Sequence, residues 1–329
     1  METEFISVGK ENVLIQAGVC SVTVAPEFGG KIASIKIDGR ELLQSPLAPL
    51  GPRTQTMSFD AGDASGWDEC LPSVAACTVT NEAGQARVPD HGDLWRVAWH
   101  ERGTGHRVRA MGSSGPESAS LSLRGECFSL PLALDRRLRV SETRRGWRLD
   151  LRYKLTNTGL SAVPWSWAAH PLFMAEAGDR ILLPESIASL RLEGSGGNRL
   201  GKNGDTVNWP IAKLADRTTD LSIAQAPGSG IGDKLFAGPL APHENWCVLE
   251  RPSARLRIKV GFDPAATPYL GLWICYGGWP DRPGPKQTCV AMEPATAPVD
   301  SLAETGPWSR ELAPGACSEW TMHVDFELI

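Results

Sequence analysis

The chain has 329 residues, of which 42% are hydrophobic and 22% charged, a composition typical of a globular protein that can bury a sizeable core. Thirty-three basic and 38 acidic side chains give a formal net charge of −5, and basic residues are adjacent only in isolated pairs. This balance argues against nucleic acid as a partner.

Neither a secretion signal nor a membrane span is predicted. Residues 1–5 are acidic and lead into no apolar segment, and no uninterrupted apolar run approaches the ~20 residues that a spanning helix needs. We therefore expect a soluble, cytoplasmic protein with no membrane partner. The eight cysteines show no C-x-x-C spacing, and several, such as Cys247 and Cys275, lie in apolar runs. We expect buried free thiols rather than disulfides or a structural zinc site.

Alternation of apolar and polar residues predicts β-strands along the whole chain. Residues 31–37 alternate up to Asp38-Gly39, a dipeptide that favours a two-residue hairpin, and residues 41–43 return as the partner strand. Further alternating segments follow at residues 119–123, 149–155, 256–262 and 320–328. In the last of them His323 falls on the polar face, which predicts a surface histidine.

The fold class follows from these segments and from what separates them. Turns rich in glycine and proline divide the strands, a helical periodicity is almost absent, and only residues 300–304 resemble a helical turn. We find no linker, low-complexity segment or internal repeat. The sequence predicts an all-β protein, with a single large antiparallel β-sandwich domain over residues 1–329.

Polar clusters interrupt the alternation at three places. Residues 66–72 contain Trp67 and Glu69, residues 90–95 contain His91, and residues 292–296 contain Glu293. Each cluster places an acid or an imidazole next to glycine or proline, where the backbone turns and presents a side chain.

His170 is a fourth candidate, because it follows a tryptophan-rich run and precedes Pro171, which favours an extended backbone at His170. A histidine at the end of a strand is more often a packing residue than an acid or base. Glu293, taken alone, is equally a carboxylate that accepts hydrogen bonds at a turn.

The order of these motifs resembles that of the aldose 1-epimerase (mutarotase) family, over most of the chain. The matching motifs are the glycine-rich turn within residues 24–32, His91-Gly92 followed by Trp99, His170-Pro171-Leu172-Phe173, Glu293-Pro294-Ala295-Thr296 and the Leu-Ala-Pro-Gly turn at residues 312–315.

The resemblance implies a large β-sandwich with a sugar-binding cleft across one sheet, and a role in carbohydrate metabolism. It implies that His170 is the general acid, Glu293 the general base, and His91 a second imidazole that contacts the ring oxygen. Asp233 resembles the aspartate of the family that binds sugar hydroxyls. The implied partner is a small-molecule sugar, and the reaction needs no metal or cofactor.

The residue types suit this reaction on physical grounds. Interconversion of anomers requires removal of the C1 hydroxyl proton and protonation of the ring oxygen, which yields an open aldehyde that rotates and closes again. A carboxyl with a pKa near ~4.3 is ionised at neutral pH, and an imidazole with a pKa near ~6.5 is easily kept protonated by a neighbouring acid. Glu293 and His170 would then start in the required states.

Four of the twelve tryptophans, at positions 67, 165, 167 and 279, lie beside the polar clusters. We expect one or two of them to stack on a pyranose, with Trp67 and Trp279 first because each neighbours a glycine. Glu69, in the same cluster as Trp67, is a further candidate for substrate binding.

Several alternatives stay open at this stage. Mutarotases for free hexoses carry an arginine motif between the first strands and the first histidine. Arg53 is the only arginine in that interval before Trp67, and the residues around it do not match the motif. Hexose-phosphate epimerases have an arginine soon after His-Gly, where this chain has Arg96 at a different spacing, so a phosphorylated or acidic sugar is an alternative substrate. A non-catalytic carbohydrate-binding protein and a glycosidase that uses Glu69 and Glu293 are the competing classes. The sequence leaves a monomer and a dimer equally open.

Overall fold

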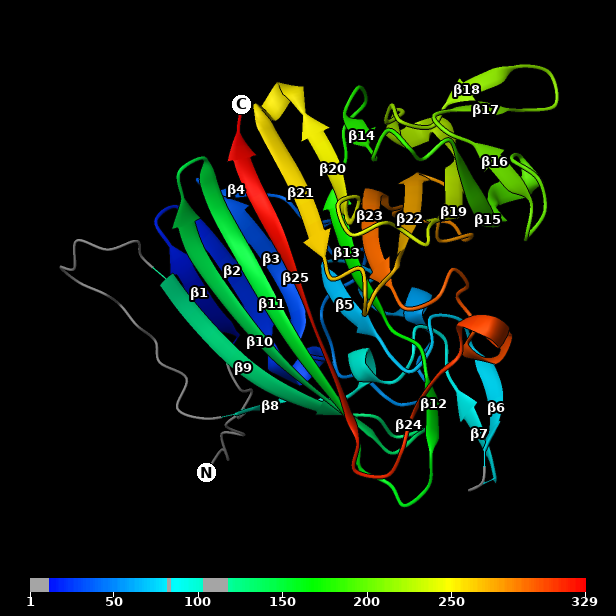
Figure 1. Ribbon diagram of the computed structural model, residues 1–329. Helices are drawn as coiled ribbons and strands as arrows, with labels where there is room; N and C mark the ends of the chain where they lie inside the picture. Colours follow the sequence, from blue (N-terminus) through cyan, green and yellow to red (C-terminus); the bar gives the residue numbers. More distant parts are fainter. Residues whose placement is uncertain (1–11, 82–83, 103–117) are drawn as a thin grey trace, which may run out of the picture.

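The computed structural model describes residues 12–81, 84–102 and 118–329 (Figure 1). The acidic residues 1–5 lie outside this range. The described residues form β-strands and three-residue 3-10 helices, and none of them is in an α-helix. The prediction of an all-β protein is confirmed. No helix within the described ranges has the length and apolar character needed to cross a membrane.

The larger of two sheets is antiparallel and has eleven strands in the described residues, ten of them in one hydrogen-bonded path with β4 paired to β3. In spatial order they are β1 (Val13–Ala17), β2 (Cys20–Ala25), β3 (Lys31–Ile37), β5 (Trp67–Cys70), β13 (Ala168–Met174), β23 (Thr288–Ala295), β22 (Tyr269–Tyr276), β19 (Ile231–Ala237), β15 (Ser189–Ser195) and β16 (Thr206–Asn208), with β4 at Arg40–Glu41.

The second sheet has eight strands in the described residues and is also antiparallel. In spatial order they are β14 (Arg180–Leu182), β20 (Trp246–Arg251), β21 (Leu256–Phe262), β25 (Cys317–Leu328), β11 (Gly146–Asn157), β10 (Leu132–Thr143), β9 (Ser118–Glu126) and β8 (His100–Glu101).

The remaining elements are short and lie in the connections. Three two-stranded ribbons pair β12 (Val163–Trp165) with β24 (Arg310–Leu312), β17 (Ile211–Lys213) with β18 (Thr218–Asp220), and β6 (Cys77–Asn81) with β7 (Gly84–Val88). The 3-10 helices are η1 (Pro26–Phe28), η2 (Phe59–Ala61), η3 (Leu94–Arg96), η4 (Gly196–Asn198), η5 (Pro227–Ser229), η6 (Pro252–Ala254), η7 (Leu302–Glu304) and η8 (Gly306–Trp308).

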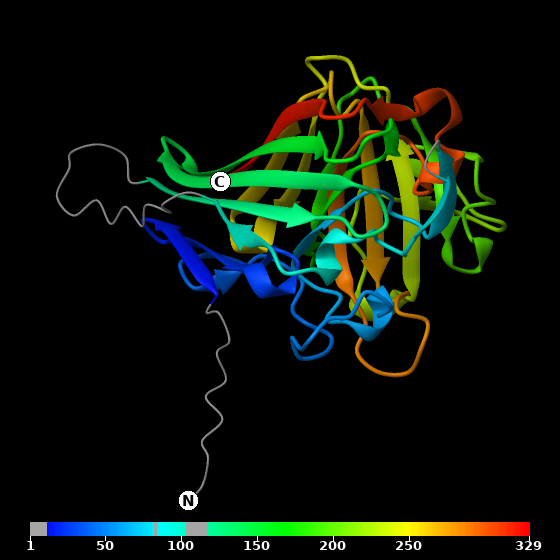
Figure 2. The ribbon, with the colours of Figure 1, turned by 90° about the horizontal axis from the view of Figure 1, so that it is seen from below.

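The core lies between the two sheets. In Figure 1 the long strands β10, β11 and β25 lie over β2 and β3, and Figure 2 shows the two layers from below. Apolar side chains at every second position of both sheets pack into one cluster, which includes Val22 and Ile35 of the large sheet and Leu138, Leu151 and Val324 of the second. Since successive side chains of a strand point to opposite faces, the other half of each strand is free to face outwards.

The local predictions agree with these elements. β3 and β21 have the predicted bounds, and the other three alternating segments lie within β9, β11 and β25. Asp38 and Gly39 have φ values of 48° and 74°, as a primed turn requires. His323 lies on the outer face of β25, and η7 forms the predicted helical turn.

All eight cysteines are free thiols, as expected. Five of them are buried, whereas Cys77 and Cys127 are partly buried and Cys317 is exposed. The prediction that Cys317 is buried is wrong. Cys317 is the first residue of β25, and its side chain lies on the outer face of the sheet.

Candidate active site

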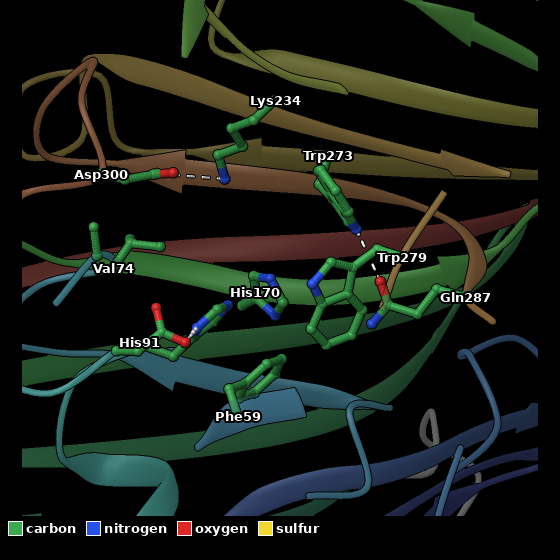
Figure 3. A pocket seen from close by; sticks show the side chains of 11 residues that line it. Phe59, Val74, His91, His170, Lys234, Trp273, Trp279, Gln287 and Asp300 are labelled. Carbon is green, nitrogen blue, oxygen red and sulfur yellow. Dashed lines mark hydrogen bonds and ion pairs between the residues drawn. The ribbon is translucent and has the colours of Figure 1, made fainter. Parts of the chain in front are cut away.

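A cavity of about 160 Å³ opens on the face of the large sheet that points away from the second sheet. β13, β23, β22 and β19, at the middle of this sheet, form its floor, and loops form its rim (Figure 3). The lining residues are Phe59, Val74, Ala75, Asp90, His91, His170, Lys234, Trp273, Trp279, Gln287 and Asp300.

His170 lies at the centre of this group, on β13 between β5 and β23 (Figure 3). Its neighbours Ala169 and Phe173 pack in the core, so the strand alternation turns His170 towards the cavity. The residue is only 6% exposed, and its Nδ1 atom has no hydrogen-bond partner among the described residues. Burial, with repulsion from His91 and Lys234, holds the pKa of His170 well below its usual value, so the imidazole is neutral. The expected protonated state is therefore not that of the free protein.

Glu293 lies on β23 beneath the cavity and is fully buried. Its Oε1 atom is 3.7 Å from Nε2 of His170 and has no hydrogen-bond partner among the described residues. Gly271 is directly opposite on β22, and a Cβ atom there would lie 3.0 Å from Oε2 of Glu293. Burial raises the pKa of Glu293, although the ammonium group of Lys234 opposes this effect.

Lys234, on β19, forms an ion pair with Oε2 of Glu293, and its Nζ atom is 3.7 Å from Oδ1 of Asp300. Burial disfavours the ammonium charge, but the two carboxylates outweigh it and raise the pKa of Lys234. Lys234 is therefore a fixed cation with two acidic partners.

His91 reaches the cavity from the loop that follows β7. The loop turns tightly, with φ of 57° at His91 and 69° at Gly92, and a Cβ atom at position 92 would lie 2.2 Å from the carbonyl oxygen of Leu71. Nδ1 of His91 lies 2.8 Å from Oδ2 of Asp90, and its ring stacks on Phe59 with a centroid distance of 3.8 Å. The two imidazole centroids of His91 and His170 are 5.1 Å apart. The structure thus brings His91, His170 and Glu293 together.

Phe59, beside His91, and the indoles of Trp273 and Trp279 form an aromatic wall of the cavity (Figure 3). Gln287 orients Trp273, since its Oε1 atom accepts a hydrogen bond of 2.9 Å from the indole and its Nε2 atom donates to the carbonyl oxygen of Ala64. These rings offer flat apolar faces beside the polar floor, the combination that suits a sugar ring.

Trp67 and Glu69, both predicted to bind substrate, do not reach the cavity. They lie on β5 with their side chains between the two sheets and are fully buried. Glu69 accepts hydrogen bonds from Arg136, Tyr153 and Trp167, at 2.9, 3.0 and 2.9 Å. The alternation of β5 gives the cavity face to Asp68, which pairs with Lys31, and not to its two neighbours.

Asp233 also points away from the cavity. It accepts hydrogen bonds from Ser195 at 2.6 Å and from Nε of Arg199 at 3.0 Å, and its side chain is fully buried. The predicted contact with sugar hydroxyls therefore has no geometric basis here. Trp165 and Trp167 are likewise core residues, packed on Trp320.

Solved structures with a similar fold match almost the whole chain. The Slr1438 protein from Synechocystis sp. PCC 6803 has a TM-score of 0.69 and 15% identity over 100% of both chains. A galactose mutarotase-like protein from Lactobacillus casei has a TM-score of 0.63 and 16% identity, over 96% of this chain and 100% of that one. A GalM/aldose epimerase homologue from C. elegans has a TM-score of 0.60 and 11% identity, over 97% and 100%.

This chain has the galactose mutarotase-like fold. No protein-family model matches the sequence, and the comparison with curated proteins gives no match. The chain shares only 11–17% of its residues with these neighbours, so it is a divergent example of the galactose mutarotase-like fold. Similarity at this level establishes the fold alone.

Sequence reasoning missed several residues that line the cavity of this galactose mutarotase-like fold: Phe59, Lys234, Trp273, Gln287 and Asp300. Of these, only Lys234 could have been found from the sequence, because it is adjacent to the predicted Asp233. Neighbouring residues of a strand point to opposite faces of the sheet, so if Asp233 faces away from the cavity, Lys234 faces it. The other four reach the cavity through loops or through strands that give no polar pattern.

Proposed function

We propose that the protein is an aldose 1-epimerase that acts on an uncharged sugar. The observation that carries this proposal is the placement of Nε2 of His170, which lines the cavity, 3.7 Å from Oε1 of Glu293, which lies buried directly beneath it. An acid and a base that face the same small volume are what anomer exchange requires.

In the proposed reaction Glu293 removes the proton of the C1 hydroxyl while His170, once protonated, donates its proton to the ring oxygen. The C1–O5 bond breaks, the aldehyde forms, and rotation about C1–C2 exposes its other face. Ring closure reverses both proton transfers and returns the two residues to their starting states. A raised pKa at Glu293 strengthens it as a base, and a lowered pKa at His170 strengthens it as an acid.

His91 is placed to support this chemistry from the side. Its hydrogen bond with Asp90 and its stacking on Phe59 fix the plane of the imidazole beside His170. We propose that His91 contacts the ring oxygen region and orients the sugar, while the three aromatic rings of the wall pack on its apolar face.

The charges around the cavity favour a neutral sugar over a phosphorylated or acidic one. Asp90, Glu293 and Asp300 are carboxylates at the site, and Lys234 is already paired with two of them. Arg96, the candidate phosphate ligand, is 5% exposed and donates to the carbonyl oxygens of Met57, Asp90 and Gly92.

Arg53 is no substitute for Arg96, because it pairs with Asp63 and donates to the carbonyl oxygen of Trp95. The glycosidase alternative also loses support, since Glu69 and Glu293 lie on opposite faces of the large sheet. A glycosidase needs two carboxyl groups that flank one bond.

The test is one-dimensional NMR of anomer exchange for a panel of neutral aldoses, sugar phosphates and uronic acids. We expect acceleration for at least one neutral aldose and for no charged one. Glu293→Gln should lose it by roughly 10²–10⁴-fold. Acceleration that survives in Glu293→Gln would contradict the mechanism, and saturable sugar binding without any acceleration would identify a carbohydrate-binding protein instead.

A further inference from the structure

The outer face of the second sheet, on the opposite side of the molecule from the cavity, carries many charged side chains. Several of its cations have an acidic partner on the same face. The pairs are Arg124 with Asp135, Arg148 with Asp325, Lys154 with Glu319, and Arg257 with Glu250.

Three arginines on this face depart from that pattern. Arg137 and Arg139 on β10 and Arg152 on β11 are exposed, and none of them has an ion pair or side-chain hydrogen bond with any residue in the described part of the chain. Arg137 and Arg152 are direct cross-strand neighbours. Like charges in that position repel each other and destabilise a sheet. Two arginines that face each other without a counter-charge therefore lower the stability of the fold.

The three arginines surround a hollow of about 280 Å³. Its lining also includes Asp150 and His323. A second hollow, of about 210 Å³, adjoins it, and Arg137 and Arg152 line both. Arg137 and Arg152 thus lie between the two hollows, and Asp135 and Glu319 also line the smaller one. The larger hollow, with its three arginines, is called the basic groove below.

The charge balance of the larger hollow is positive. Asp150 is its one carboxylate against three guanidinium groups, and although Asp150 is opposite Arg139 in register, no ion pair joins them. His323 adds no charge, because burial, together with the nearby Arg148, lowers its pKa despite the opposing carboxylates of Asp325 and Asp150.

We propose that this basic groove binds a multiply charged oxyanion, such as a phosphorylated or sulfated small molecule. Adjacent guanidinium forks match the oxygens of phosphate and sulfate in two-point hydrogen bonds. A bound dianion would also neutralise the repulsion between Arg137 and Arg152. The site is separate from the sugar cavity and does not depend on the activity proposed for it.

Isothermal titration with pyrophosphate, inorganic phosphate and sulfate tests the proposal, and a preference among the three distinguishes phosphate from sulfate chemistry. We expect saturable binding that weakens with salt. Arg152→Gln and Arg137→Gln should each weaken it roughly tenfold or more. Arg257→Gln is the matched control, since it removes the same charge from the same face outside the groove, and it should leave binding unchanged.

Thermal unfolding supplies a second, independent readout. Without anion, Arg152→Gln should raise the midpoint, because it removes the cross-strand repulsion. At the same concentration of pyrophosphate, the variant should gain less stability than the wild type. Anomer exchange should be the same in both. No binding of any of the three anions, or binding equally weakened by Arg257→Gln, would overturn the proposal.

Discussion

Lys234 and Glu293 form an ion pair although their strands, β19 and β23, are not adjacent in the sheet. β22 lies between them, and the residue of β22 opposite Glu293 is Gly271, which has no side chain to separate the two charges. The lysine therefore closes over the buried carboxylate and holds it in place.

Loss of the Lys234 ammonium group should destabilise the protein and change the titration of Glu293. In Lys234→Met the buried carboxylate keeps no cation, so we expect a loss of about 3 kcal/mol in the free energy of unfolding. The double variant Lys234→Met/Glu293→Gln should recover part of it, because the fully buried charge of Glu293 is then gone and only the more exposed Asp300 has lost its cation. Urea unfolding of the two single variants and the double variant measures this coupling. Strictly additive losses would show that the pair is not coupled.

The pH dependence of anomer exchange should be narrow and acidic. Glu293 must be deprotonated to act as a base, and its raised pKa moves the acidic limb of kcat/KM upwards. His170 must carry a proton to act as an acid, and its lowered pKa moves the alkaline limb downwards, so activity falls as pH rises through that lowered value. A profile of kcat/KM against pH checks both limbs. A flat profile above neutral pH would mean that His170 acts as a neutral hydrogen-bond donor.

Trp279 and Trp67 were both predicted from the sequence to contact sugar, but truncation should affect KM in the first case and stability in the second. Trp279 lines the cavity, so Trp279→Ala should raise KM roughly two- to tenfold. Trp67 is fully buried between the sheets, so Trp67→Ala should cost about 3–5 kcal/mol of stability. Steady-state kinetics and thermal unfolding of both variants distinguish the roles. An unchanged KM in Trp279→Ala would exclude the aromatic wall as a sugar contact at that ring.

Arg96 should prove structural. Its guanidinium donates to the carbonyl oxygens of Met57, Asp90 and Gly92 and stacks on Trp95, and burial lowers its pKa to about 10. Arg96→Met should cost about 1–3 kcal/mol for each carbonyl left without a donor and should not change discrimination between a sugar and its phosphate. The same NMR panel, run below the unfolding midpoint of the variant, provides the comparison. A selective loss of activity on a phosphorylated sugar would restore the hexose-phosphate alternative.

The fold was predictable because strand periodicity is a local signal. Residues 256–262 alternate strictly and residues 31–37 largely do, and the hairpin at Asp38-Gly39 needs only the two residues at its tip. The motif around His170 was also informative, since the proline after it keeps the strand extended and the alternation decides its face.

The site was less predictable, because a short motif does not show which of two neighbouring strand residues points to the cavity. Asp233 and Lys234 are neighbours, yet one pairs with Arg199 and the other with Glu293. Trp67 and Glu69 fail for the same reason, since Asp68 between them takes the cavity side. Asp300 and Phe59 come from loops, and only the tertiary arrangement brings them to Lys234 and His91.

The position of β13, bonded on one edge to β5 and on the other to β23, has a consequence for hydrogen exchange. Amides around His170 should exchange only on global unfolding, whereas Phe59, His91 and Trp279 lie on connections that can open locally. A sugar that binds here should slow exchange in those connections and leave the rate at β13 unchanged. The strand that carries His170 would then belong to the slowest-exchanging part of the molecule. The connections that carry Phe59, His91 and Trp279 would exchange faster.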